Sequence, residues 1–289
     1  MHRTRRNKNL KSLLIAILIF LLLGIPSYIW TKKNVSALSG RYNAVMTPII
    51  MIPGSDSNAS RLDGLIKAVD QKYGENHSVL KITVKTNNQV TYSGSIRSHD
   101  QHPFIVVGFQ NSGDGFSNIK KQVVWFNIAF NELRKKYQFH SFDAFGHSNG
   151  ALIWTYFLED YFDETGLQIN HLMTIGAPFN FEETNPDNHT EMLNQLIKGR
   201  QNLPSNMSYY SVAGTKQYFD DGIVPLSSVD SGKYIYQNQV KLYTLITLTG
   251  SNAEHSDMLT NPQFITLFHQ FIVQENSNRK IIDSQNNRP

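Results

Sequence analysis

The chain has 289 residues, of which 40% are hydrophobic and 17% charged, a balance typical of a globular protein with a sizeable buried core. It contains no cysteine, which excludes disulfide bonds, thiolate metal sites and a cysteine nucleophile. The net charge of +4 arises at the N-terminus, because residues 1–41 hold eight Lys and Arg and no acid. Residues 42–289 hold 19 cations and 23 acids, so the folded part lacks the basic excess that binds nucleic acid.

The N-terminus has the pattern of an export segment. Five Lys and Arg in residues 1–11 precede the mostly apolar run SLLIAILIFLLLGIPSYIW, close to the ~20 residues that span a bilayer. Because such basic flanks stay in the cytoplasm, we predict a single-pass membrane anchor over residues 12–31 and an extracellular remainder. Residues 32–44 would form a linker. A signal peptide cleaved near Val35-Ser36-Ala37, which would release the protein, is the alternative.

Short apolar runs alternate with helix-like segments between residues 45 and 275. We expect strands in TPIIMIPG, PFIVVGFQ, SFDAFG, HLMTIGAPF, SYYSVAG and KLYTLITLTG, and a pair of strands in KITVKTNNQVTYSGSI. Helical spacing follows over residues 119–137, 151–161, 192–198 and 262–273. The alternation predicts an α/β fold with a doubly wound, mostly parallel sheet flanked by helices. Residues 276–289 are polar and are expected to form a disordered tail.

The pentapeptide Gly146-His147-Ser148-Asn149-Gly150 follows an expected strand and opens an expected helix. A serine on such a sharp turn is strained, and flanking glycines let the backbone fold tightly beside it. This context is typical of a nucleophile elbow, in which the serine hydroxyl attacks a substrate. A tight turn between strand and helix without catalysis is the alternative.

A serine nucleophile needs a base, and the base needs an orienting acid. On this fold the acid and then the histidine follow the serine in the chain. Asp221 lies in a loop after the strand SYYSVAG, and His255 lies in a loop after the strand KLYTLITLTG. Both loops are expected at the same edge of the sheet as Ser148, which predicts a Ser148, Asp221 and His255 triad. Asp220 is the rival acid, and we prefer Asp221 because it directly precedes the glycine of the turn.

Other histidines fit the role of the base less well. His269 lies on a helical face and is expected to be packed or surface-exposed, and the elbow is expected to turn His147 away from the serine. His99 and His102 lack a convincing third metal ligand, so a solvated loop is preferred there and no metal is predicted.

The loop IMIPGSDSNAS is expected to complete an oxyanion hole. Gly54 permits close backbone approach, and the N–H of Ser55 could join that of Asn149 in holding an oxyanion. A turn that caps the next helix through Ser57, Asn58 or Ser60 is the alternative, and both functions are compatible.

The segments IPGSDS, GHSNG, DDGIVPLSS and EHSDML, in this order, resemble the α/β-hydrolase superfamily, and most closely its bacterial cell-surface members long catalogued as a domain of unknown function. The resemblance covers roughly residues 45–275 and implies a serine hydrolase of carboxylic esters. The sequence departs from the usual pattern at Pro53-Gly54, where relatives carry His-Gly, and at residues 149–151, where they often carry Met-Gly-Gly.

The expected function is therefore hydrolysis of a small-molecule or lipid ester through an acyl-enzyme, without a cofactor. A surface-tethered binding protein with a decayed site, or an acyltransferase or peptidase with the same triad, is the alternative. Residues 179–208 form a long connection between two expected strands and contain a polar loop and one amphipathic helix. They are expected to form either a lid with Met192 and Leu196 in an acyl pocket or a plain crossover.

Overall fold

The computed structural model describes residues 15, 17–32, 46–216 and 218–274, in two units, Met1–Ala44 and Val45–Pro289. In the first unit, residues 17–32 are helical, and the large apolar side chains described from Ile15 to Trp30 are all exposed. Within the described residues, no helix is both long and apolar enough to cross a membrane. The expected basic flank, the cleavage site, the linker beyond Lys32 and the C-terminal tail lie outside the described residues.

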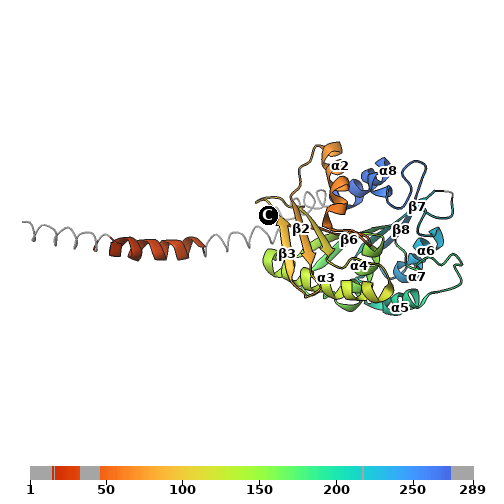
Figure 1. The fold of residues 1–289 in the computed structure, drawn as a ribbon, viewed down its shortest axis with the longest axis horizontal. Helices are drawn as coiled ribbons and strands as arrows, with labels where there is room; N and C mark the ends of the chain where they lie inside the picture. The colour runs from red at the N-terminus through yellow and green to blue at the C-terminus, as the bar shows by residue number, and fades with distance from the viewer. Residues whose placement is uncertain (1–14, 16, 33–45, 217, 275–289) are drawn as a thin grey trace, which may run out of the picture. The chain divides into compact units, whose positions relative to one another are not determined.

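The second unit is built on an eight-stranded sheet with the order β3-β2-β4-β1-β5-β6-β7-β8 (Figure 1). Every neighbouring pair is parallel except β2 and β3, which form the antiparallel hairpin expected around Asn87-Asn88. β8 lies at the edge of this sheet and pairs with β7. The strands are β1 (Ile49–Ile52), β2 (Val79–Val84), β3 (Val90–Gly94), β4 (Phe104–Phe109), β5 (Ser141–His147), β6 (Gln168–Ile175), β7 (Ser208–Thr215) and β8 (Leu242–Thr249).

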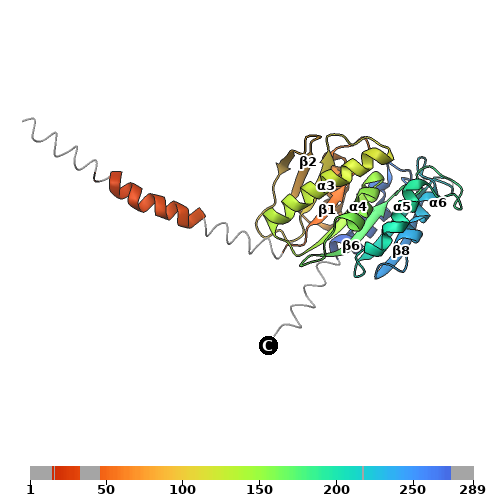
Figure 2. The same ribbon diagram turned by 90° about the horizontal axis from the view of Figure 1, so that it is seen from below.

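Helices cover both faces of the sheet (Figures 1 and 2). The longer helices are α2 (Asp63–Tyr73), α3 (Phe116–Tyr137), α4 (Asn149–Asp160), α5 (Glu191–Gly199) and α8 (Pro262–Phe268), which continues into the π-helical η4 (His269–Gln274). Short elements are α6 (Leu226–Asp230), α7 (Gly232–Tyr236), η1 (Ala59–Leu62), η2 (Arg200–Asn202) and η3 (Met258–Thr260). The doubly wound, mostly parallel fold expected from the sequence is confirmed.

The side chains of the central strand β1 pack into two separate hydrophobic cores, one on each face of the sheet. Successive side chains of a strand point to opposite faces, so Ile50 and Ile52 pack with residues of α3, α4 and α5, whereas Ile49 and Met51 pack with residues of α2 and α8. All four side chains are fully buried. This explains the continuous apolar run in the sequence, since a strand covered on both faces does not alternate apolar and polar residues.

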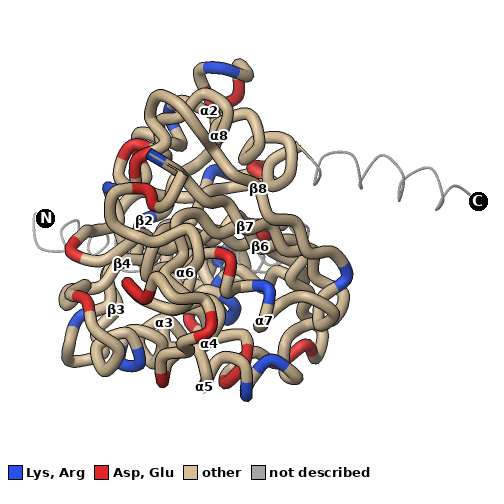
Figure 3. Tube along the Cα trace, turned by 90° about the vertical axis from the view of Figure 1, so that its right-hand side faces the viewer, with Lys and Arg blue, Asp and Glu red and all other residues tan. Residues whose placement is uncertain are grey.

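Charged residues are distributed without a basic region on the face seen in Figure 3, where Lys, Arg, Asp and Glu positions are interspersed.

The helix α4 is almost entirely buried. Eleven of its twelve residues are buried, and its charged residues, Glu159 and Asp160, stand only at its C-terminal end. A helix that is apolar on nearly all sides is a core helix. It holds the residue before it, Ser148, on a rigid base.

The amphipathic helix in residues 179–208 is α5, and its apolar face packs into the core. Met192 and Leu196 are 1% and 0% exposed and belong to the cluster around α4. Bulkier residues at these two positions would therefore perturb the core. From this segment, Phe181 and Glu182 reach the cavity described below.

Candidate active site

Ser148 lies between β5 and α4 with φ 53° and ψ −127°, a strained conformation for a residue with a side chain. The flanking glycines make this turn possible. A Cβ on Gly146 would lie 2.7 Å from the backbone nitrogen of Ala151, and one on Gly150 would collide with the carbonyl of Ile52. The sequence thus forms the expected elbow, with its serine at the C-terminal edge of the sheet.

Asp221 and His255 meet although 34 positions separate them in the chain. The Asp221 Oδ2 atom lies 2.7 Å from the Nδ1 atom of His255, and the His255 N–H donates to the Asp221 carbonyl at 2.8 Å. Both residues are buried, at 1% and 6% exposure. Because a carboxylate only accepts hydrogen bonds, Nδ1 carries a proton, and in the neutral ring Nε2 then has the lone pair. A histidine in this tautomer has the form of a general base.

The second carboxylate oxygen of Asp221 is also occupied. Its Oδ1 atom accepts the N–H groups of Ile223 at 3.0 Å and of Val224 at 2.7 Å. Asp220, the rival acid, accepts the N–H of Gly222 at 2.8 Å and makes no hydrogen bond to His255 among the described residues. The geometry therefore separates the two adjacent aspartates.

Ser148 and His255 line one cavity of about 760 Å³. Among the described residues, the structure shows no direct hydrogen bond between the two side chains, as is common before substrate binds. The wall combines apolar and polar groups. Its apolar side chains belong to Phe116, Pro178, Phe181, Ile223 and Val224, and its polar ones include Ser55, Asp56, Ser57, Arg61, Asp114, Asn149, Glu182 and Ser256.

The loop after β1 approaches the serine closely. A Cβ on Gly54 would lie 2.9 Å from the Cβ of Ser148, so only glycine fits without displacement. Ser55 and Asn149 both line the cavity, as an oxyanion hole requires. The capping alternative also holds, because Asn58 caps η1 by accepting the Ser60 N–H at 2.8 Å.

His147 lies closer to the site than the sequence led us to expect. Its ring centroid is 5.0 Å from that of His255, and its Nε2 atom lies 3.2 Å from the His255 carbonyl oxygen. Burial lowers the pKa of His147 to about 3, and the neighbouring His255 opposes its protonation further. His147 is thus a neutral group whose Nε2–H donates to the backbone carbonyl of His255. Sequence reasoning missed this contact because it depends on a loop 108 residues away.

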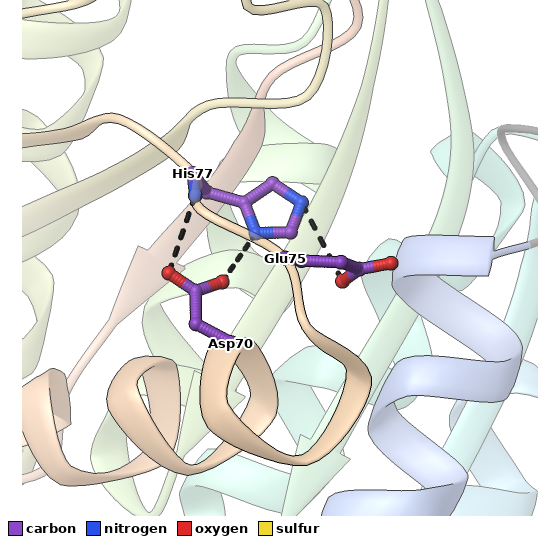
Figure 4. Close-up of side chains that lie close together, drawn as sticks. All are labelled: Asp70, Glu75 and His77. Atoms are coloured by element: carbon purple, nitrogen blue, oxygen red, sulfur yellow. Dashed lines mark hydrogen bonds and ion pairs between the residues drawn. The ribbon is translucent and has the colours of Figure 1, made fainter.

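One group of three side chains within the described residues has the spacing of metal ligands, namely Asp70, Glu75 and His77 (Figure 4). The His77 Nδ1 atom lies 2.6 Å from Asp70 Oδ1, and its Nε2 atom lies 3.8 Å from Glu75 Oε2. Glu75 Oε1 also lies 3.1 Å from His269 Nε2, and the His269 ring stacks on Tyr73. These contacts join the turn after α2 to η4. Of the two positions expected for His269, packed or exposed, the structure shows the packed one, and His99 and His102 do not belong to this group.

The sheet order, the elbow and the cavity at the C-terminal edge define an α/β hydrolase. Residues 37–275 match the family described as alpha/beta hydrolase of unknown function (DUF915), and the chain belongs to this family. A crystal structure of a proposed cell surface hydrolase from Lactobacillus plantarum WCFS1 is 49% identical, with a TM-score of 0.72 over 78% of this chain and 91% of that one. A gene product of Listeria innocua is 28% identical, with a TM-score of 0.72 over 78% and 93% of the two chains. Comparison with curated proteins gives no significant match.

Proposed function

We propose that this α/β hydrolase cleaves carboxylic esters through a triad of Ser148, Asp221 and His255. The observation that carries the proposal is the buried contact between Asp221 and His255, which opens on the same cavity as a serine on a strained elbow. The two backbone N–H groups on Oδ1 also occur in an ordinary turn aspartate, so the contact of Oδ2 with a buried histidine is the feature that distinguishes Asp221. No cofactor takes part in the proposed reaction.

In the proposed mechanism, the Nε2 atom of His255 takes the proton of the Ser148 hydroxyl, and the oxygen attacks the ester carbonyl carbon. The N–H groups of Ser55 and Asn149 hold the resulting oxyanion, and the N-terminal end of α4 adds its positive dipole. When the tetrahedral intermediate collapses, His255 returns the proton to the leaving alcohol. Water then attacks the acyl-enzyme in the same way, while Asp221 stabilises the charged His255.

A fluorophosphonate probe tests the nucleophile directly, because it forms a covalent bond with an activated serine. The wild-type protein should be labelled on Ser148 and should hydrolyse p-nitrophenyl esters, and Ser148→Ala should do neither. A folded wild-type protein that is neither labelled nor active on short-chain and long-chain p-nitrophenyl esters would show that the site is not a serine esterase.

We propose further that the enzyme works outside the cytoplasmic membrane, with residues 12–31 as its anchor. Two observations support this: the basic flank before the apolar run in the sequence, and the similarity to a proposed cell surface hydrolase. Protease added to intact cells should degrade the hydrolase domain. Survival in intact cells with cleavage in lysed cells would contradict the outward orientation, and a mature N-terminus near Leu38 would indicate a cleaved signal instead.

A further inference from the structure

The loop between β4 and α3, residues 110–115, contacts both halves of the proposed oxyanion hole. On one side, the N–H of Asp56, which follows Ser55, donates to the Ser112 carbonyl at 2.9 Å. On the other side, the Asn149 Nδ2 group donates to Asp114 Oδ1 at 2.7 Å. One short loop therefore contacts the residue after Ser55 and the side chain of Asn149, next to the two backbone N–H groups proposed as oxyanion donors.

The loop has its own internal support. Asn111 Oδ1 accepts the Gly113 N–H at 3.2 Å and the Asn118 Nδ2 group at 3.1 Å. Gln122, which is 2% exposed, donates to the carbonyls of Asn111 at 3.1 Å and Gly113 at 2.9 Å. Because Asn118 and Gln122 belong to α3, the loop is fastened to a long helix and keeps one shape.

The carboxylate of Asp114 is oriented by two donors. Its Oδ1 atom accepts the Gly115 N–H at 2.6 Å in addition to the Asn149 amide. Asn149 is 4% exposed and is the first residue of α4. A hydrogen bond from another segment to its side chain can therefore hold the first turn of that helix in place.

We propose that Asp114 is a positioning residue, which acts through the Asn149 side chain and keeps the Asn149 N–H aimed at the oxyanion. The inference rests on the proposed function, since it concerns the geometry of the same oxyanion hole. A misplaced donor costs little in substrate binding, because the ground-state carbonyl needs the hole less than the oxyanion does. Loss of the contact should therefore lower kcat and leave KM nearly unchanged.

The test compares Asp114→Ala, Asp114→Asn and Asn149→Leu in p-nitrophenyl butyrate hydrolysis, with Ser148→Ala as the inactive reference. Asp114→Ala and Asn149→Leu should each lower kcat about 10- to 100-fold, the range expected when an oxyanion donor is displaced but not removed. Asp114→Asn keeps the accepting oxygen and should retain kcat within about 3-fold. The Asp114→Ala, Asn149→Leu double variant should be about as slow as the slower single variant, because both substitutions remove the same hydrogen bond between the two side chains.

Asp187→Ala is the matched control, since it removes an exposed carboxylate that does not line the cavity, and it should leave kcat unchanged. Unchanged kcat in folded Asp114→Ala, or additive losses in the double variant, would overturn the inference while the triad stands. A raised KM at constant kcat would make Asp114 a substrate contact instead. An Asp114→Asn variant as slow as Asp114→Ala would also overturn the inference, because restoring an accepting oxygen would then not restore turnover. If the wild-type protein takes no fluorophosphonate label, the proposed function fails, and this inference fails with it.

Discussion

Replacing Asp221 with asparagine changes one atom and should nearly abolish turnover. The two N–H groups of Ile223 and Val224 point at Oδ1, so the variant amide must keep its oxygen there. Its NH₂ group then faces His255 Nδ1, where the carboxylate oxygen lies at 2.7 Å in the native chain. Because an amide nitrogen only donates, Nδ1 must become the acceptor, and the ring proton moves to Nε2. The base then presents a proton to Ser148 in place of a lone pair.

The expected loss is about 10⁴-fold in kcat, the size seen when a triad histidine is held in the wrong tautomer. At ~1.4 kcal/mol per factor of ten, this corresponds to about 5 kcal/mol of transition-state stabilisation. Steady-state hydrolysis of a p-nitrophenyl ester measures it, with far-UV circular dichroism to confirm folding. Asp220→Asn is the control and should retain most activity, because its oxygen still accepts the Gly222 N–H. The reverse result, an active Asp221→Asn and an inactive Asp220→Asn, would refute the choice between the two aspartates.

Three further predictions follow from the same geometry. Ser148→Ala and His255→Ala should each lower ester hydrolysis by several orders of magnitude, and the double variant should be about as slow as either; an active His255→Ala would remove the whole triad assignment. Burial raises the pKa of the Glu159 carboxyl to about 9, so the folded state binds a proton that the unfolded state loses above its ordinary value of 4.5. Stability from Glu159 should thus decline between about pH 4.5 and pH 9, and Glu159→Gln should raise the thermal midpoint at pH 8 and leave it nearly unchanged at pH 4; equal shifts at both pH values would contradict this. Phe181→Ala should move the preference among p-nitrophenyl esters toward longer acyl chains, because Phe181 lines the cavity; an unchanged profile would exclude the side chain from the acyl pocket.

The site could be located from the sequence because its parts are local patterns. A strand, two glycines around a serine and a helix together define the elbow, and the chain order of acid and histidine then limits the search to two loops. The preference for Asp221 over Asp220 rested on turn chemistry, and the contacts of Oδ1 with two backbone N–H groups agree with that reasoning. The assignment of the triad itself stays a prediction until the variants are measured.

Contacts between distant segments could not be predicted in this way. The bond from Asn149 to Asp114 joins residues 35 positions apart, and its existence depends on the shape of a loop that has no periodic signal. The amphipathic pattern of α5 left open whether Met192 and Leu196 face an acyl pocket or belong to a plain crossover, and both pack into the core and do not line the cavity. The helices α6 and α7 have five residues each, too short for a helical period to be visible in the sequence.

Because β8 lies at the edge of the sheet, the residues of the proposed triad have different mechanical support. Ser148 follows β5, which has paired strands on both sides, whereas His255 follows β8, which in the described sheet pairs with β7 alone. Edge strands open more readily than central ones, since fewer contacts must break. Partial unfolding that begins at β8 would carry the base away from an intact elbow. Mild heat or denaturant should then reversibly abolish ester hydrolysis while most of the fold persists.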